Sequence, residues 1–273
     1  ARVLRVAERT QHFCHIPKVL YHWRVISASI AADIAAKPYV LAASKKVRED
    51  ALLRRGLSGL VEAVEQVPGY FRVNYLPQNN PLISIIIPTR DHAQVLQRCI
   101  ESIEGKSSYR HFEIIVMDNG SKDSATLALL ATLEKENHVR VIRHDQPFNF
   151  SELNNIGAEA AHGELLLFLN DDTEVLSPDW LERLAGYAQL PHVGAVGAKL
   201  LYPNGDTQHA GLLNLSAGPG HAFLNASPDS HGYFMRNLLE YNWLAVTGAC
   251  LMLEAKKFHT VGGFDKSFPV AYN

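Results

Sequence analysis

The sequence of 273 residues predicts an α/β protein with an open, mostly parallel sheet and helices on both faces. From residue 81 onward, short apolar runs rich in β-branched residues alternate with segments of helical periodicity. The apolar runs are continuous, as in parallel strands that are buried on both faces. Polar residues follow these runs directly, and ligands of such sheets bind beyond the carboxyl ends of the strands.

The elements of this region are predicted in order along the chain. The first strand covers Ile83–Ile87 and ends at Pro88. The helix after it has an apolar face formed by Leu96, Cys99, Ile100 and Ile103. Further strands are predicted at 113–117, 139–142 and 164–169, and further helices at 126–136 and 151–161. A last helix is expected to begin with Ser177 as its N-cap and Pro178 as its first residue.

Residues 1–80 are predicted to form a separate, mainly helical segment. A helical pattern extends from about Pro38 to Val67 and is interrupted at Gly56 and Gly59. Its basic residues are interspersed with acidic ones, which favours a solvated face over contact with an anionic membrane surface. Residues 68–81 contain three prolines, one glycine and three asparagines, so we expect a linker there and a domain boundary near residue 80.

Composition and charge exclude several classes of protein. The chain has 26 Lys and Arg against 28 Asp and Glu, so bulk charge gives no reason to expect a nucleic-acid partner. Its three cysteines are far apart in the sequence and lack metal-ligand spacing, which indicates neither a disulfide framework nor a zinc site. No apolar run approaches the roughly 18 residues of a membrane span, and no signal peptide opens the sequence, so we expect a cytoplasmic location.

Acidic residues at the ends of two predicted strands suggest a ligand site. The fourth strand continues into Asn170, Asp171 and Asp172, and the second ends at Asp118. A divalent cation between such carboxylates and a phosphorylated ligand would explain why like charges gather there. The alternative is that Asp171 and Asp172 only open a solvated turn, because Asp is common in turns. Neither GxGxxG nor GxxxxGK[ST] follows any strand, which argues against a dinucleotide fingerprint and a P-loop.

Five segments occur in a characteristic order: SIIIPTRD, IIVMDNGSKD, FNFSELNNIGAEAAHGELLLFLNDDTEV, AVTGACLMLE and VGGFDKSFPVAYN. In this order they resemble the family-two inverting glycosyltransferases of GT-A fold, which transfer sugars from nucleotide donors. The resemblance is strongest to the bacterial rhamnosyltransferase-like members that build surface polysaccharides. It covers about residues 81–273 and implies a GT-A domain over that range.

The resemblance also implies which residues bind the nucleotide and a metal ion. The nucleotide-binding positions are Thr89, Arg90, Asp118, Asn149, Asn155 and Asp171. Among them, Asp118 is expected to accept a hydrogen bond from the base. Asp172 takes the place of the metal-binding second aspartate of the family's Asp-x-Asp motif, and Asn170 replaces the first. Mg²⁺ or Mn²⁺ at Asp172 would neutralise the departing diphosphate.

The resemblance places further residues on the sugar side, where His221, Thr247 and Gly248 would face the donor sugar or the acceptor. His22 and His209 lack the spacing of metal-ligand motifs and are predicted to be packed or acceptor-side residues. The catalytic base of this family lies in an acidic pair shortly after the GGFD motif, and the sequence ends at Asn273, where that pair would begin. Asp265 belongs to GGFD itself and is expected to be a turn residue, so we name no base.

The beginning of the sequence resembles the part of such a domain that follows the acidic pair. This applies to Val3–Glu8 and to the segment HIPKVLYHWR. Residues 1–80 are therefore expected to be the tail of a preceding glycosyltransferase domain plus a helical linker. Residues 81–273 would be a second such domain that is cut before its catalytic base, as in a segment of a tandem enzyme.

The predicted function is metal-dependent sugar transfer in bacterial surface polysaccharide synthesis. The donor would be UDP-, dTDP- or GDP-linked, and the acceptor a saccharide or lipid-linked saccharide, with peripheral association at the inner membrane face. The alternative is a non-catalytic nucleotide-sugar-binding or scaffold module. An aspartyl-phosphate phosphohydrolase would need DxDx[TV] after the first strand, and a sugar-nucleotide pyrophosphorylase would need a glycine-rich basic loop there. The sequence has neither feature.

Overall fold

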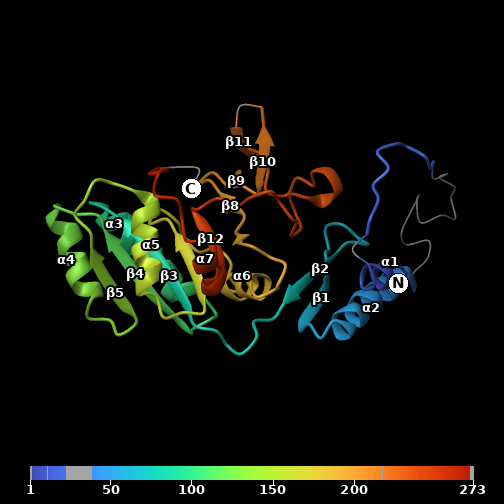
Figure 1. Ribbon diagram of the computed structural model, residues 1–273, viewed down its shortest axis with the longest axis horizontal. Helices are drawn as coiled ribbons and strands as arrows, with labels where there is room; N and C mark the ends of the chain where they lie inside the picture. The colour runs from blue at the N-terminus through green and yellow to red at the C-terminus, as the bar shows by residue number, and fades with distance from the viewer. Residues whose placement is uncertain (1, 11, 23–38, 217, 271–273) are drawn as a thin grey trace. The chain divides into compact units, whose positions relative to one another are not determined.

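The computed structural model describes residues 2–10, 12–22, 39–216 and 218–270 (Figure 1). The chain divides into two compact units, Ala1–Leu76 and Pro77–Asn273. Within the described ranges, no helix combines the length and the apolar character needed to cross a membrane. The predicted helix start at Pro38, as well as Trp23 and Arg24 of the HIPKVLYHWR segment, lie outside these ranges.

The larger unit is built on a six-stranded mixed sheet with the strand order β5-β4-β3-β6-β12-β7. Its strands are β3 (Ile83–Thr89), β4 (Phe112–Asp118), β5 (Val139–Arg143), β6 (Leu165–Leu169), β7 (Val196–Gly197) and β12 (Cys250–Glu254). The first four are parallel, whereas β12 pairs antiparallel with both β6 and β7. The chain passes from β3 outward to β5 and returns to the other side of β3 with β6. Ligands of open α/β sheets bind at such a reversal of strand order.

Helices cover both faces of this sheet and complete two apolar cores. The helices are α3 (Ala93–Lys106), α4 (Ser124–Leu133), α5 (Phe150–Ala160), α6 (Trp180–Ala188) and α7 (Ala255–Thr260). Alternate residues of β3 point to opposite faces. Ile85 and Ile87 pack with residues of α3, α4 and α6, and Ile86 packs with residues of α5 and α7. The predicted open, mostly parallel α/β sheet with helices on both faces is confirmed.

Close packing of α5 on the sheet makes Gly157 sensitive to substitution. A Cβ atom at Gly157 would lie 2.5 Å from Cγ2 of Ile86 and 3.4 Å from the Met117 side chain. Both neighbours are fully buried, so neither side chain has room to move. We expect Gly157→Ala to lower the free energy of unfolding by about 1–3 kcal/mol, the usual cost of overpacking. Denaturant unfolding measures this change.

The matched control is Gly105→Ala, in the exposed last turn of α3. A Cβ atom there meets nothing within 4 Å. Because alanine favours helix more than glycine does, this control should raise the free energy of unfolding by about 0.5–1 kcal/mol. A Gly157→Ala variant that is as stable as the Gly105→Ala variant would contradict the tight packing between α5 and β3.

The helix predicted at Ser177 begins later than expected. Its first residue is Trp180 and its N-cap is Asp179, whose side chain makes no capping hydrogen bond. The carbonyl of Pro178 accepts hydrogen bonds from the backbone N–H and the hydroxyl of Ser108, both at 2.8 Å. Pro178 therefore belongs to a loop that is held against the loop after α3. The predicted boundaries of the other helices and strands in residues 81–170 agree with the structure within a few residues.

The part of the sequence between α6 and β12 forms a layer of short strands that projects from the main sheet (Figure 1). It contains β8 (Leu200–Leu201), β9 (Thr207–His209), β10 (Leu212–Leu215), β11 (Gly218–His221) and the 3₁₀ turn η2 (Tyr233–Met235). β8 pairs with β9, and β10 pairs with β11. The chain leaves this layer and enters β12 next to the end of β6, because Cys250 pairs with Leu169. The layer therefore joins the main sheet at its carboxyl edge.

The smaller unit is mainly helical, as predicted, but it also contains a hairpin that the sequence analysis did not predict. It contains α1 (Arg2–Ala7), α2 (Tyr39–Arg54), and a hairpin of β1 (Gly59–Ala63) and β2 (Phe71–Tyr75). Gly56 has φ +64° and stops α2, while the N–H of Leu57 bonds the carbonyl of Leu52 at 3.0 Å, as in a Schellman cap. The predicted linker 68–81 thus includes strand β2. Apolar and aromatic residues at these positions favour strand once the glycine has ended the helix.

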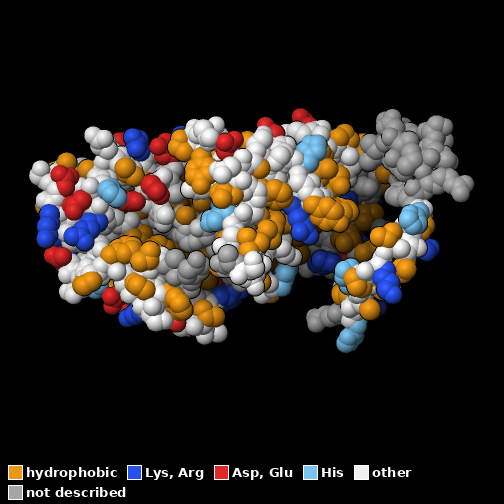
Figure 2. All heavy atoms as spheres, turned by 90° about the horizontal axis from the view of Figure 1, so that it is seen from above, with side chains coloured by type: hydrophobic (Ala, Val, Ile, Leu, Met, Phe, Trp, Pro, Cys, Tyr) orange, Lys and Arg blue, Asp and Glu red, His pale blue; other side chains and the backbone are white. Residues whose placement is uncertain are grey.

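The surface has no large field of one sign of charge in the view of Figure 2. Acidic and basic side chains lie among one another there, separated by hydrophobic and uncharged groups. This distribution matches a net charge of -2. Any anionic ligand must therefore be held by local groups rather than by bulk attraction.

Candidate functional site

A hydrogen bond between two strand ends marks the reversal of strand order. The hydroxyl of Thr89, at the end of β3, donates to Oδ2 of Asp171 at 2.7 Å. Asp171 follows β6 and also has Nδ1 of His92 at 3.5 Å from the same oxygen. Thr89 and Asp171, both predicted as nucleotide-binding residues, are thus brought together although they lie 82 residues apart in the sequence.

Asp118 ends β4 as a buried carboxylate, with a side chain that is only 2% exposed. Its Oδ1 accepts the backbone N–H of Ser121 at 2.8 Å, and its Oδ2 accepts Nη1 of Arg143 at 3.0 Å. Arg143 also donates to the carbonyl of Ser121 at 3.1 Å, which closes a ring of three residues. A carboxylate has about four acceptor positions. Asp118 therefore keeps acceptor capacity for a ligand while its charge is balanced.

The loop after β4 is held against the loop after β5. Gly120 has φ +74°, a left-handed conformation that favours glycine, and a Cβ atom there would lie 2.2 Å from Oδ1 of Asp145. Asn119 donates through Nδ2 to the carbonyls of His144 and Gln146 at 2.9 and 2.8 Å. Its Oδ1 is buried and has no hydrogen-bond partner in the described structure. These contacts hold the loop after β4 in place beside Asp118.

Asp91 is a structural residue of this edge to which the sequence analysis assigned no role. Its Oδ1 accepts the backbone N–H groups of Lys122 and Asp123 at 2.6 and 2.8 Å, and its own N–H donates to Oγ of Ser121 at 3.0 Å. The N–H groups of Asp123 and Lys122 lower the pKa of Asp91 from its ordinary value. Asp91 adopts φ +54°, a conformation that aspartate tolerates better than most residues. This tolerance is the one local feature of the sequence that could have indicated the structural role of Asp91.

The loop after β6 presents one free carboxylate. The backbone N–H of Asn170 bonds the carbonyl of Ala249 at 3.0 Å, and the carbonyl of Asn170 accepts the hydroxyl of Thr173 at 2.9 Å. The side chain of Asp172 is exposed and makes no hydrogen bond or ion pair with any described residue. An anchored loop therefore holds an acidic group that is available to a ligand.

These residues fit a cation that is shared with a phosphorylated ligand. No group of three or more His, Cys, Asp or Glu side chains that suits a metal occurs in the described ranges. Asp171 is engaged with Thr89, and Asp172 is free. Mg²⁺ usually takes one or two protein carboxylates and completes its shell with substrate phosphates and water. The loop after β6 supplies this number of carboxylates.

The other predicted nucleotide-side residues are engaged differently. Arg90 is exposed, and its Nε lies 3.8 Å from Oδ2 of the neighbouring Asp91. Asn149 caps α5 by accepting the N–H of Glu152 at 3.0 Å, and it donates to the carbonyl of Lys266 at 2.9 Å. Asn155 exchanges two hydrogen bonds of 2.9 Å with the backbone of Phe264. Both asparagines therefore hold residues 264–266 on α5, and their contact with a nucleotide stays a prediction.

The residues predicted to face the donor sugar or the acceptor lie next to the carboxyl edge of the sheet. Nδ1 of His221 lies 3.0 Å from Nδ1 of His209, and Nε2 of His209 accepts the N–H of Thr247 at 3.4 Å. Gly248 packs against Phe150, because a Cβ atom there would lie 3.3 Å from its ring. Burial, followed by the proximity of His221, lowers the pKa of His209 to about 4. The sequence analysis did not place His209 beside His221.

The two buried cysteines, Cys99 and Cys250, are unsuited to nucleophilic chemistry. All three cysteines are free, and Cys14 is exposed. Burial raises the pKa of both Cys99 and Cys250 to about 12, so these thiols stay protonated near neutral pH. Cys99 packs under the loop after β6, with its Sγ 3.8 Å from the carbonyl of Asn170.

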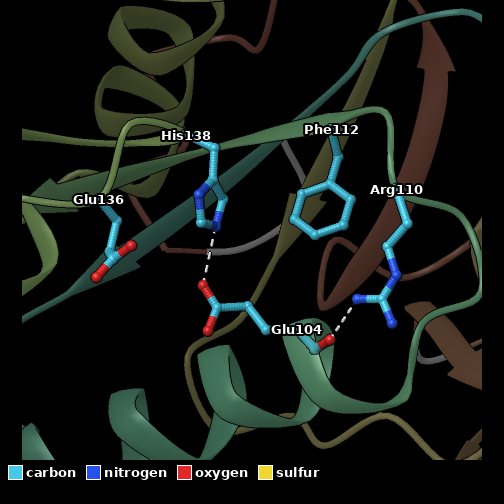
Figure 3. Close-up of a pocket in the computed structure, with 5 residues that line it drawn as sticks. All are labelled: Glu104, Arg110, Phe112, Glu136 and His138. Carbon is cyan, nitrogen blue, oxygen red and sulfur yellow. Dashed lines mark hydrogen bonds and ion pairs between the residues drawn. The ribbon is translucent and has the colours of Figure 1, made fainter.

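A hollow lies at the edge of the sheet opposite to the carboxyl edge (Figure 3). It is lined by Glu104, Arg110, Phe112, Glu136 and His138. Nε2 of His138 lies 2.9 Å from Oε1 of Glu104, and Arg110 donates to the backbone carbonyl of Glu104. Phe112 and His138 lie where β4 and β5 begin, away from the carboxylates. His138 and Arg110 are both bonded to Glu104, whereas Asp172 at the carboxyl edge is free within the described ranges, so we place the candidate site at the carboxyl edge.

Comparison with known proteins identifies the family of the larger unit. Residues 84–262 match the family described as glycosyl transferase family 2. The chain belongs to this family. The matched range includes β3 to β12 and therefore Thr89, Asp118 and Asp172.

Two curated relatives of this family 2 chain match nearly its whole length. The uncharacterized protein y4gI of Sinorhizobium fredii is 43% identical over 97% of this chain and 30% of its own length. The O-antigen biosynthesis protein RfbC of Myxococcus xanthus is 38% identical over 98% of this chain and 21% of its own length. The chain thus spans less than a third of either relative.

A solved structure of similar fold is a mannosyltransferase from Pyrobaculum calidifontis in complex with GDP-mannose and Mn²⁺. It is 16% identical, with a TM-score of 0.49 over 70% of this chain and 49% of that chain.

Proposed function

We propose that this chain contains the donor-binding part of a metal-dependent, inverting glycosyltransferase. It would take a sugar from a nucleotide-sugar and deliver it to a saccharide acceptor in bacterial surface polysaccharide synthesis. The observation that carries the proposal is the free carboxylate of Asp172 beside the Thr89–Asp171 bond, at the strand-order reversal of a family 2 domain. The name of the Myxococcus relative, an O-antigen biosynthesis protein, supports the choice of pathway.

Asp118 and Asp172, both at the carboxyl edge of the sheet, would have different roles. Asp118, held by Ser121 and Arg143, would accept a hydrogen bond from the base of the nucleotide. Asp172, assisted by Asp171, would hold Mg²⁺ or Mn²⁺. A bound cation would stabilise the charge that develops on the departing diphosphate. The free carboxylate thus serves the leaving group, and the buried carboxylate serves recognition.

The remaining partners follow from the same proposal. The donor would be a UDP-, dTDP- or GDP-linked sugar, and the acceptor a saccharide or a lipid-linked saccharide. Transfer would take place in the cytoplasm, with peripheral association at the inner face of the membrane. In an inverting displacement a base must lie within about 3 Å of the acceptor hydroxyl to remove its proton. We assign this role to none of the residues that the structure describes.

Calorimetric titration of the chain tests the proposal. UDP, dTDP and GDP would each be added with and without Mn²⁺. We expect one nucleotide to bind, and to bind at least about tenfold more tightly with Mn²⁺, because Asp172 would hold the cation that offsets the charge of the diphosphate. If none of the three binds to a chain that circular dichroism shows to be folded, the proposal is wrong. If one nucleotide binds, sugar transfer by the full-length protein separates an enzyme from a non-catalytic binding module.

A further inference from the structure

His209 and His221 form a close pair of imidazoles in the layer of short strands. His209, at the end of β9, is 1% exposed, whereas His221, at the end of β11, is exposed. Their Nδ1 atoms lie 3.0 Å apart, and their rings are nearly perpendicular, with an interplanar angle of 82°. At this distance one Nδ1 must carry a proton and the other must accept it, since two donors or two acceptors would repel.

The backbone of Thr247 decides which histidine is the donor. Its N–H points to Nε2 of His209 at 3.4 Å, so this nitrogen acts as an acceptor and carries no proton. Neutral His209 then carries its proton on Nδ1 and donates it to Nδ1 of His221. His221 in turn keeps its own proton on Nε2, at its exposed side. The lowered pKa of His209 agrees with a neutral imidazole at this position.

The pair is connected to the acidic loop through consecutive hydrogen bonds. The N–H of Ala249 donates to the hydroxyl of Thr247 at 3.3 Å, and the N–H of Asn170 donates to the carbonyl of Ala249 at 3.0 Å. Asn170 directly precedes Asp171 and Asp172. The imidazole pair therefore belongs to the same bonded framework as the carboxylates of the candidate site.

We infer that His209 is a positioning residue of this site, which fixes His221 in the tautomer that presents Nε2–H to a sugar hydroxyl. An N–H of fixed orientation donates to the lone pairs of a hydroxyl oxygen, and the tautomer of a histidine is set by the bond of its other nitrogen. The hydroxyl belongs either to the donor sugar or to the acceptor saccharide. The inference rests on the proposed function for the identity of this ligand.

Two substitutions of His209 separate this role from simple packing. In His209→Asn, the amide nitrogen takes the place of Nδ1 and can still donate to His221. In His209→Gln, the amide oxygen can replace the acceptor Nε2, and no donor remains in the place of Nδ1. Both variants remove the buried ring. Because asparagine and glutamine differ by one methylene, thermal unfolding of both variants measures the difference in packing, and the tautomer of His221 reports the role of the hydrogen bond.

The first measurement is the tautomer of His221, read from its ring nitrogens by ¹H–¹⁵N NMR. We expect the proton on Nε2 in the native chain and in His209→Asn, and a mixture of tautomers in His209→Gln. A proton on Nδ1 of His221 in the native chain would overturn the inference, as would an unchanged spectrum in His209→Gln. This measurement needs no ligand, so it stands even if no nucleotide binds.

The second measurement compares ligands with and without a sugar. UDP, dTDP and GDP would be titrated beside UDP-glucose, dTDP-glucose and GDP-mannose, and methyl glycosides would be added to the chain saturated with nucleotide. We expect His209→Gln to leave nucleotide binding unchanged and to weaken binding of the sugar-bearing ligand about tenfold, as for the loss of one hydrogen bond. His209→Asn should stay near the native affinity.

The ligand that is affected identifies the source of the hydroxyl. Weaker binding of a nucleotide-sugar places the donor sugar at His221, and weaker binding of a methyl glycoside places the acceptor there. If both variants bind every sugar-bearing probe with equal affinity, the positioning role is wrong. If the native chain binds no nucleotide, the proposed function fails, and the tautomer measurement alone then decides the role of His209.

Discussion

Asp172→Ala is expected to abolish the gain in nucleotide affinity that Mn²⁺ provides. Asp172 is the carboxylate in the loop after β6 that has no hydrogen-bond or ion-pair partner among the described residues. Its removal leaves Asp171, whose Oδ2 is engaged with Thr89 at 2.7 Å. Because the cation would lose its free carboxylate ligand, we expect the affinity measured with Mn²⁺ to fall by the whole of this gain, about tenfold or more. Affinity without the metal should change little.

Glu174→Gln is the matched control for this variant. Glu174 lies in the same loop with a side chain that is 53% exposed, and its carboxylate lies 3.5 Å from Nε of Arg98. Its substitution also removes one negative charge near the site. If loss of charge alone weakened metal-dependent binding, both variants would show it. An Asp172→Ala variant that retains the full effect of Mn²⁺ would place the cation elsewhere or exclude it.

The parallel strands and their helices were predictable because burial on both faces leaves a clear pattern. Ile83–Thr89 and Leu165–Leu169 are apolar along almost their whole length. The end of each run then locates the carboxyl edge of the sheet. Asp118 and Asp171 stood out for the same reason, since a carboxylate at or close to the end of a buried strand requires an explanation.

The short strands escaped prediction because they lack such a pattern. β8 and β7 each have two residues, and β11 has the sequence Gly-Pro-Gly-His. In the smaller unit, strand β2 falls within a segment rich in proline and asparagine that otherwise indicates a linker. Such elements form through pairing with a neighbour, which a local window of sequence does not contain.

The partners of the site residues were unpredictable for a related reason. Arg143 reaches Asp118 from a strand 25 residues away, and His209 meets His221 across 12 residues. Neither pair has a spacing that a motif would reveal. Asp91 likewise bonds backbone groups 31 and 32 residues away. The sequence therefore identified the charged ends of the strands, whereas the groups that orient them emerged only from the fold.

Asp118→Asn is expected to weaken nucleotide binding equally with and without Mn²⁺. The substitution preserves the shape of the side chain, removes its charge, and replaces the acceptor oxygen that faces Arg143 by an NH2 donor. A hydrogen bond to a charged group contributes about 1.5–3 kcal/mol, so we expect a loss of about 10- to 100-fold in affinity. The half-exposed Arg143 can then turn to solvent, so the fold should survive. Calorimetric titration of the nucleotide that the native chain binds measures the loss.

Asp145→Asn is the control for this second variant. Asp145 is 63% exposed and lies 3.6 Å from Nη2 of the same Arg143. Its substitution therefore removes a charge beside the arginine and leaves Asp118 unchanged. Its nucleotide affinity should stay near the native value. Equal losses in Asp118→Asn and Asp145→Asn would mean that only the charge balance around Arg143 matters, and that Asp118 does not contact the base.

A double variant that combines Asp118→Asn and Asp172→Ala tests whether these two carboxylates act on separate parts of one ligand. If Asp118 contacts the base and Asp172 holds the cation at the diphosphate, their free-energy losses in the presence of Mn²⁺ should add within about 0.5 kcal/mol. Without Mn²⁺, the double variant should match Asp118→Asn alone. A loss in the double variant that is clearly smaller than the sum would mean that both carboxylates support the same contact, and the division into recognition and leaving-group stabilisation would then be wrong.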